Sequence, residues 1–345
     1  MRTSESTELL THYGSHIREH LEDPRVTEIC INGPERIYVE IEGRLILTQS
    51  RFPNEESLVN YVRMIAHSIG QEVSASQPLL DARLADNTRI SATLPPVSLY
   101  GTSVSIRPFP KEVFRLEDLV SRGAIPAEAV PLIDLAVHER LNLLVTGGTG
   151  SGKTTVLRCV CQMVPHDERI LTAEDTAENL APGHPHICAF EAPRRKPNDS
   201  TPRITMADLI VEMLRKRPDR PVVGEIRTPE AAAALIDAIN TGHGGTLSTM
   251  HANNGVDAFD RLDILYARQA PNIHIDTIKS LTRKNIDLVI HVAKDRDPDG
   301  TFVRRLKEIV WVDGEQPRHL IRHSRRTGYK YEEETIEEYK TAVLD

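Results

Sequence analysis

The stretch LNLLVTGGTGSGKTT at residues 141–155 constrains the fold of this chain more than any other part of its sequence. It contains the pattern G-x-x-x-x-G-K-[ST], with Gly147, Gly152, Lys153 and Thr154 at the fixed positions. An apolar run precedes the glycines as a buried strand would, and a segment with helix-like spacing follows them. Successive backbone N–H groups of such a loop turn inward around a phosphate chain, and the start of the helix adds positive potential. The pattern therefore predicts a loop that binds a nucleoside triphosphate.

The parts of this loop have separate expected tasks. Lys153 would reach the β and γ phosphates, and the Thr154 hydroxyl would bind Mg²⁺. We expect the phosphate contacts to come from eight consecutive residues: Gly148, Thr149, Gly150, Ser151, Gly152, Lys153, Thr154 and Thr155.

The composition is that of an ordinary globular protein. Hydrophobic residues make up 39% and charged residues 27% of the 345 positions, and this length predicts two domains. No run approaches the roughly 18 apolar residues of a membrane span, and the N-terminus lacks a signal-peptide pattern, so we expect a cytoplasmic protein. The net charge of −8 and the aromatic content of 4% argue against direct nucleic-acid binding.

The four cysteines predict neither a disulfide nor a metal site. Cys159 and Cys161 fall in the expected helix after the loop, about 200° apart around it, so they cannot share one metal ion. The sequence contains no C-x-x-C pair. We expect buried free thiols, as in a protein of a reducing compartment.

Residues 1–108 have the pattern of a smaller α/β domain. We expect helices at 7–21 and 57–70 and strands at 26–33, 36–47 and 88–97. Pro108 and Pro110 break any regular element within 103–120, which predicts an interdomain linker there, with limits at 109–125.

Strands and helices alternate over residues 126–345, the expected second domain. Strands are expected at 141–146, 169–173, 187–191, 221–225, 244–249, 286–293 and 302–313, and helices at 128–139, 153–164, 205–216, 229–240, 255–268 and 274–285. This alternation predicts a mainly parallel sheet covered by helices, with a ligand at the carboxyl ends of the strands. The highly charged tail after Trp311 is expected to be a frayed helix or a flexible end.

Two of the expected strands end in a glutamate. Glu174 follows an apolar run and could polarise an attacking water, while Asp175 beside it is a candidate helix cap. Glu225 ends the run VVGE, where phosphate-loop enzymes place the acid that contacts Mg²⁺ through water. An ion pair between Glu225 and Arg227 is the structural alternative.

The segment TGHGGTLSTMHANN adds two imidazoles. His243 and His251 bracket the expected strand GTLST, and a histidine can donate to a γ-phosphate or sense its loss. The sequence does not decide which of the two faces the nucleotide, and ordinary surface or core positions are the structural alternative. Their spacing is poor for a shared metal ion.

The order GGTGSGKTT, AEDTAE, GEIR and TGHGGTLSTMHAN resembles the secretion or traffic ATPases, which power type IV secretion, type II secretion and type IV pili. The four blocks correspond to the Walker A, Asp box, Walker B and His box of that family. The resemblance implies a RecA-like P-loop ATPase domain, joined by a linker to the N-terminal α/β domain, in a hexameric ring. ATP would lie between the two domains and beside a neighbouring subunit.

This resemblance also implies residue roles. Lys153 and Thr154 would bind phosphate and Mg²⁺. Glu174 would be the base that activates water, and Glu225 the acid of the Mg²⁺ shell. His243 or His251 would contact the γ-phosphate.

Two arginines of the N-terminal part match the family pattern R-[IV]-x-A-x-x-P-P…S-[IV]-x-I-R. They are Arg89 in TRISATLPPV and Arg107 in SVSIRPF. The planar fork of an arginine near the triphosphate would neutralise charge in the transition state. Surface salt bridging is the alternative for both. Arg215 and Arg217 also match the family, with less defined roles.

The compact length and the lack of a tetracysteine zinc module resemble the conjugation-type type IV secretion ATPases. This likeness implies a Mg²⁺-dependent ATPase without zinc, which is peripheral to the inner membrane. Its partners would be copies of itself in a homo-hexamer and inner-membrane secretion or pilus proteins. A tight-adherence pilus motor is the first alternative. A RecA-like DNA translocase and a nucleotide-binding regulator without turnover are the others.

Overall fold

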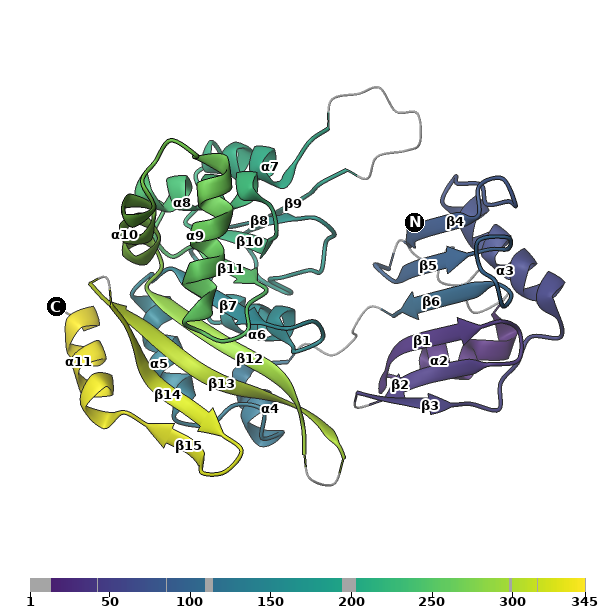
Figure 1. Ribbon diagram of the computed structural model, residues 1–345, viewed down its shortest axis with the longest axis horizontal. Coiled ribbons are helices and arrows are strands. Elements are labelled where there is room, and N and C mark those ends of the chain that lie inside the picture. Colours follow the sequence, from purple (N-terminus) through teal and green to yellow (C-terminus); the bar gives the residue numbers. More distant parts are fainter. Residues whose placement is uncertain are drawn as a thin grey trace. The chain divides into compact units, whose positions relative to one another are not determined.

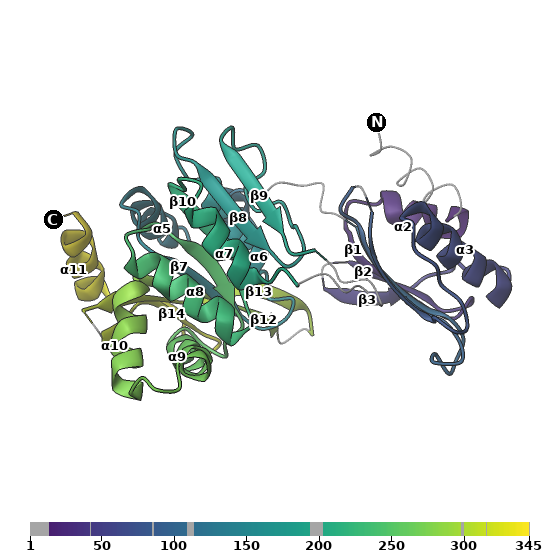
Figure 2. The same cartoon turned by 90° about the horizontal axis from the view of Figure 1, so that it is seen from above.

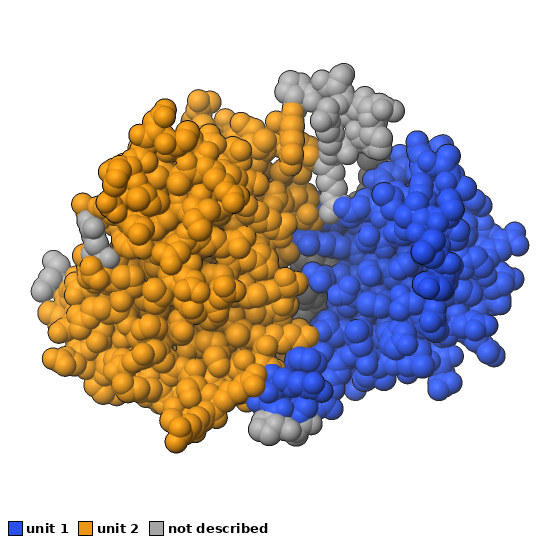
Figure 3. All heavy atoms as spheres, in the orientation of Figure 1, with its two compact units in different colours: residues 1–113, 296–303 blue, residues 114–295, 304–345 orange. Residues whose placement is uncertain are grey.

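The computed structural model describes residues 14–41, 43–84, 86–108, 114–193, 203–297, 300–314 and 316–344. The chain forms two compact units (Figure 3), residues 1–113 with 296–303 (unit 1) and residues 114–295 with 304–345 (unit 2). Unit 2 begins earlier than residue 126, where the sequence places the start of the second domain. The predicted domain limits stay a prediction.

Unit 1 is an antiparallel sheet with helices on one face (Figure 2). Its elements are η1 (Ser15–Ile17), α2 (Arg18–Glu22), β1 (Val26–Asn32), β2 (Ile37–Ile41), β3 (Arg44–Leu47), α3 (Glu55–Ser68), β4 (Leu79–Arg83), β5 (Arg89–Thr93) and β6 (Ser103–Arg107). The strand order is β3-β2-β1-β6-β5-β4, and each pair runs antiparallel. Its core lies between the sheet and the apolar side of α3. Asn54 begins α3 by accepting a hydrogen bond from the Ser57 N–H at 2.9 Å.

Two expectations for unit 1 need correction. The segment expected to be part of a linker contains β6, which lies between β1 and β5 near the middle of the sheet. Val104 and Ile106 point inward from alternate positions of β6 and are fully buried. This alternation is the pattern of a strand, and the prolines that follow it led to the expectation of a linker instead. The helix expected at 7–21 is described only from residue 14, where η1 and α2 form, and residues 1–13 lie outside the described part. Strand β4 was not expected.

Unit 2 is a helix-covered sheet whose middle is parallel. Its elements are α4 (Leu116–Ser121), α5 (Ala129–His138), β7 (Leu143–Gly147), α6 (Lys153–Cys161), β8 (Ile170–Glu174), β9 (Ile187–Glu191), α7 (Met206–Leu214), β10 (Arg220–Ile226), α8 (Pro229–Asn240), β11 (Leu247–Met250), α9 (Asp257–Gln269), α10 (Ile275–Asn285), β12 (Leu288–Arg296), β13 (Phe302–Asp313), β14 (Gln316–Ser324), β15 (Gly328–Tyr331) and α11 (Glu333–Leu344). The strand order is β15-β14-β13-β12-β7-β11-β10-β8-β9. The strands from β12 to β9 in this order run parallel.

Two apolar cores hold helices on the two faces of this sheet (Figure 1). Helices α4, α5, α6 and α11 pack on one face, and α7, α8, α9 and α10 pack on the other. Neighbouring residues of β7 serve both cores, since Leu143 and Val145 face the first and Leu144 faces the second. The α/β class and the parallel sheet expected from the alternating pattern are confirmed.

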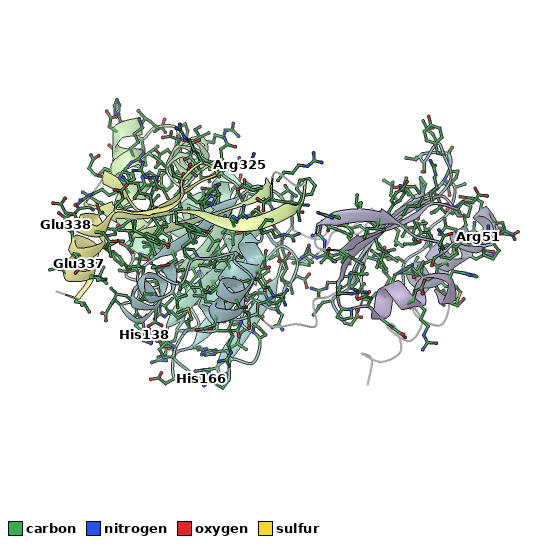
Figure 4. The ribbon with its side chains drawn as sticks, turned by 90° about the horizontal axis from the view of Figure 1, so that it is seen from below. Arg51, His138, His166, Arg325, Glu337 and Glu338 are labelled. Carbon is green, nitrogen blue, oxygen red and sulfur yellow. The ribbon has the colours of Figure 1, made fainter. Side chains whose placement is uncertain are left out.

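The expectation of a frayed helix or a flexible end after Trp311 is wrong. The charged tail forms regular elements that complete the fold. Strands β14 and β15 extend the sheet antiparallel, and α11 packs back onto the first core. Tyr339 is fully buried, and its hydroxyl donates to the Leu132 carbonyl at 3.0 Å. Glu337 and Glu338 lie on the exposed side of α11 (Figure 4), so the charges that suggested a loose end line the outer face of a packed helix.

Among the residues that the structure describes, none of the helices is both long and apolar enough to cross a membrane.

Candidate nucleotide-binding and hydrolysis site

The predicted phosphate loop joins β7 to α6 at the carboxyl end of the parallel strands. Strand β7 is buried throughout and ends at Gly147, and α6 begins at Lys153. Gly150 and Gly152 have φ angles of +69° and +98°, which side chains with a Cβ rarely adopt. Left-handed residues of this kind are the ones that an anion-binding nest of backbone N–H groups uses.

The first glycine of the loop is needed for close packing. A Cβ on Gly147 would lie 2.1 Å from the carbonyl oxygen of Val292 on β12 and 2.5 Å from Oγ of Ser151. The Ser151 hydroxyl is buried and has no hydrogen-bond partner among the described residues. The start of the loop is thus pressed against the neighbouring strand, which fixes its direction.

Lys153 is held inside the loop rather than extended into solvent. It is 8% exposed, and its Nζ donates to the Gly148 carbonyl at 3.2 Å. The same Nζ lies 3.4 Å from Nδ1 of His251, which follows β11. Burial lowers the pKa of Lys153, and the nearby Glu225 carboxylate acts in the opposite direction.

Glu225 lies at the centre of a small charged cluster. Its Oε2 accepts a hydrogen bond from Arg227 at 2.5 Å, and His251 Nε2 lies 2.8 Å from its Oε1. That Oε1 is buried and lacks an aligned hydrogen-bond donor. Burial lowers the pKa of His251, with the charge of Lys153 adding to the effect, which favours a neutral imidazole. The ion pair of Glu225 with Arg227, which was the structural alternative, is present, and the other carboxylate oxygen faces His251.

Glu174 ends β8, which is the neighbour of β10. The residue is 2% exposed, and it accepts hydrogen bonds from the Glu178 backbone N–H at 2.6 Å and the Thr172 hydroxyl at 3.2 Å. Burial raises the pKa of Glu174 to about 7, against the lowering effect of these two bonds. A Cβ on Gly224 of β10 would approach Glu174 Cγ to 3.2 Å, so the glycine leaves room for this carboxylate. A carboxyl group with a pKa near neutrality is suited to proton transfer.

The strand register separates the two histidines. β11 pairs with β7 in parallel, with Leu247 opposite Leu143 and Met250 opposite Thr146. His251 therefore follows β11 at the end of the sheet that carries the phosphate loop. His243 precedes the strand at the other end, where its Nδ1 lies 3.1 Å from the Ala238 carbonyl. Of the two histidines, His251 is the one that lies beside Lys153 and Glu225.

The two predicted arginines belong to unit 1. Arg89 and Arg107 are register partners on β5 and β6, so they lie side by side at one end of that sheet. Arg107 forms an exposed ion pair with Glu28 at 3.3 Å. Their role at the nucleotide stays a prediction.

Two residues at the site, His291 and Arg304, lie outside the sequence motifs. The imidazole of His291 on β12 is 2.9 Å from the Thr146 hydroxyl through its Nδ1, and both residues are buried. Arg304 on β13 donates from its Nε to the Gly150 carbonyl at 2.9 Å. No spacing in the sequence indicates these pairings, because they depend on which strands become neighbours of β7.

The described residues fit a triphosphate with a hydrated Mg²⁺. The phosphate loop offers backbone donors, and Lys153 supplies a buried positive charge beside them. The Glu225 carboxylate, at the end of the sheet that carries the loop, is the kind of group that binds a metal-bound water. Thr154 and Thr155 lie half-buried in the first turn of α6. Glu174 ends β8, which follows β7, β11 and β10 in the order of the sheet. It therefore lies at the same end of the parallel strands as the loop.

Comparison with known proteins identifies the family of this chain. A putative conjugal transfer protein of Mycobacterium tuberculosis, Rv3659c, is 36% identical over 290 residues, which cover 82% of this chain and 80% of that protein. The type IV secretion system protein VirB11 of Brucella suis is 31% identical over 338 residues, covering 90% and 92%. The X-ray structure of the ATPase DotB of Legionella pneumophila has the same fold, with a TM-score of 0.62 and 21% identity over 91% of this chain and 82% of that one. The profile of the type II/IV secretion system proteins matches residues 12–295. The chain belongs to the type II/IV secretion system protein family.

Proposed function

We propose that this protein hydrolyses ATP and acts as a motor of a type IV secretion or conjugative transfer apparatus. The convergence of Lys153, Glu225, His251 and Glu174 at one edge of the unit 2 sheet carries the proposal. These side chains come from four separate segments of the sequence, and a simple nucleotide-binding role gives no reason for a buried carboxyl group with a raised pKa among them. The relatives named conjugal transfer protein and VirB11 support the biological setting.

The proposed roles follow from the surroundings of each side chain. The loop amides and Lys153 bind the β and γ phosphates. Glu174 in its ionised form takes a proton from the attacking water, and its two hydrogen-bond donors hold the carboxylate in one orientation. His251, kept neutral by burial, would contact the γ-phosphate from the side of Lys153. Mg²⁺ would screen the phosphate charge, with Thr154 and Glu225 as its proposed protein contacts.

The assembly is proposed by likeness to the family. We propose a homo-hexamer that docks on inner-membrane secretion or pilus proteins, with Arg89 and Arg107 contributing to the closed nucleotide site. Their adjacency on β5 and β6 supports a joint role, because both guanidinium groups would approach any ligand from the same end of the sheet. Light scattering on the purified protein with ATP and Mg²⁺ measures the stoichiometry, and a monomer under all conditions would contradict the ring.

Phosphate release by the purified protein tests the activity itself. Lys153→Ala is expected to abolish hydrolysis, because it removes the buried positive charge that lies against the Gly148 carbonyl of the loop. Unfolding of the variant is monitored through the single tryptophan, Trp311 on β13 in unit 2, so that loss of fold is distinguished from loss of chemistry. Unaltered turnover in a folded Lys153→Ala protein would overturn the site. Omission of Mg²⁺ should stop the wild-type reaction.

A further inference from the structure

Two carbonyl groups of the phosphate loop are held by cationic side chains. The Gly148 carbonyl accepts from Lys153 within the Walker A motif. The Gly150 carbonyl accepts from Nε of Arg304, which comes from β13 far along the chain. A Cβ on Gly152 would lie 3.6 Å from Cδ of Arg304, so the arginine stem also borders the last residue of the loop. Arg304 is the residue at which β13 enters unit 2.

The direction of the Gly150 carbonyl decides whether the loop attracts or repels an anion. The C=O and N–H of one trans peptide unit point in opposite directions. With the Gly150 carbonyl directed at Arg304, the Ser151 N–H of the same peptide turns into the loop, where it makes a long 3.4 Å bond to the Gly148 carbonyl. A phosphate oxygen would be a better acceptor for this N–H, because a charge-assisted hydrogen bond is shorter and stronger.

A glycine-rich loop does not hold this direction by itself. Rotation of the Gly150–Ser151 peptide changes ψ of Gly150 and φ of Ser151, and Gly150, which has φ +69° and no Cβ, offers little steric resistance to it. A rotated Gly150–Ser151 peptide would present its oxygen to the phosphates and remove one donor from the nest. A positively charged donor on the outer side of the loop opposes that rotation.

We propose that Arg304 is a positioning residue of the nucleotide site: through the Gly150 carbonyl it keeps the phosphate loop in its anion-binding shape before the nucleotide arrives. The inference rests on the proposed function and assigns a part of it to a residue outside the four motif blocks. Arg304 acts through the loop, so its removal should weaken nucleotide binding more than it changes the rate at saturating ATP.

Three variants separate loop positioning from charge. Arg304→Ala removes the donor and the charge. Arg304→Gln removes the charge but places an amide nitrogen at the same number of bonds from the backbone as the arginine Nε. Arg305→Ala removes the same charge from the next residue of β13, whose side chain points to the other face of the sheet. The affinity for a fluorescent ADP analogue with Mg²⁺ is measured for each, together with the hydrogen exchange of the loop amides in nucleotide-free protein.

The expected pattern is specific. Arg304→Ala should bind the analogue about tenfold more weakly, as for loss of one charge-assisted hydrogen bond, and its loop amides should exchange faster without any ligand. Arg304→Gln should stay within about threefold of the wild type in both measurements. A threefold change corresponds to less than half of the binding free energy that a tenfold change represents. Arg305→Ala should match the wild type.

Two results would overturn the inference. One is an Arg304→Ala protein with unchanged affinity and unchanged exchange. The other is an Arg304→Gln protein that is as impaired as Arg304→Ala, because that pattern means that the charge at position 304, and not the hydrogen bond to the loop, supports nucleotide binding. A wild-type protein that binds no nucleotide would instead contradict the proposed function, so the two failures are distinguishable.

Discussion

Replacement of Glu174 by glutamine tests the chemistry and the electrostatics of the site together. Burial raises the pKa of Glu174 from 4.5 to about 7 in the folded protein, so between these pH values the folded state keeps a proton that the unfolded state has lost. The folded state therefore loses stability as the pH rises through this window. At 1.36 kcal/mol for each pH unit, the difference corresponds to about 3 kcal/mol between pH 4.5 and pH 7.

Glu174→Gln should remove this pH dependence without breaking the local hydrogen bonds. The amide oxygen can accept from the Glu178 N–H, and the amide nitrogen can donate to the Thr172 hydroxyl, in place of the two bonds that the carboxylate accepts. The variant should therefore gain about 3 kcal/mol relative to the wild type when the pH is raised from 4.5 to 8. It should also bind ATP and fail to cleave it, because it keeps the shape and lacks the base.

The assay is urea unfolding at a series of pH values, followed by the fluorescence of Trp311, which is 7% exposed and belongs to unit 2. Phosphate release is measured over the same pH range, and the wild-type rate should rise through about pH 7 as Glu174 ionises. Glu230→Gln, at an exposed position in the first turn of α8, is the matched control for loss of one carboxylate. Wild-type turnover in Glu174→Gln would refute the catalytic role, and an unchanged pH dependence of its stability would refute the buried, proton-retaining state.

Three further predictions concern other parts of the site. His251→Ala should lower kcat by roughly tenfold or more, because this imidazole lies against Lys153 and Glu225. His243→Ala should leave kcat within about twofold of the wild-type value. A larger effect of His243→Ala than of His251→Ala in a steady-state assay would contradict this assignment. Gly147→Ala should lower the free energy of unfolding by about 3 kcal/mol or more, since its Cβ would overlap the Val292 carbonyl, while Gly148→Ala has open space and should be nearly neutral in the same urea titration. Arg107→Ala should slow hydrolysis by roughly tenfold or more if the arginine stabilises the transition state, and normal rates would show that unit 1 supplies no catalytic arginine there.

Local patterns in the sequence predict the centre of unit 2 well. The Walker A spacing requires a strand before it and a helix after it, and the structure has β7 and α6 in those places. The apolar runs that lead into Glu174 and Glu225 become β8 and β10 because each run is short and buried. These features depend on neighbours within a few residues, which a single sequence contains.

Long-range pairing accounts for what the sequence did not indicate. The choice of His251 over His243 depends on the register of β11 against β7. Arg304 reaches the phosphate loop only because β13 lies two strands from β7 in the sheet. The C-terminal strands were missed for a related reason: their charged residues alternate with buried ones such as Leu320 and Ile321, and their partners lie on β13.

Gly224, the residue before Glu225, packs directly against the Glu174 side chain, so two motifs that are distant in the sequence depend on each other sterically. Gly224 has no side chain, and the space next to it is filled by the Glu174 side chain from the adjacent strand. Any larger residue at position 224 would press on a carboxylate whose orientation is already fixed by two hydrogen bonds, and a shorter acid at position 174 would leave a void beside the glycine. Evolutionary change at either position is therefore conditional on the other, so substitutions at 174 and 224 should be judged as a pair when variants of this family are compared or engineered.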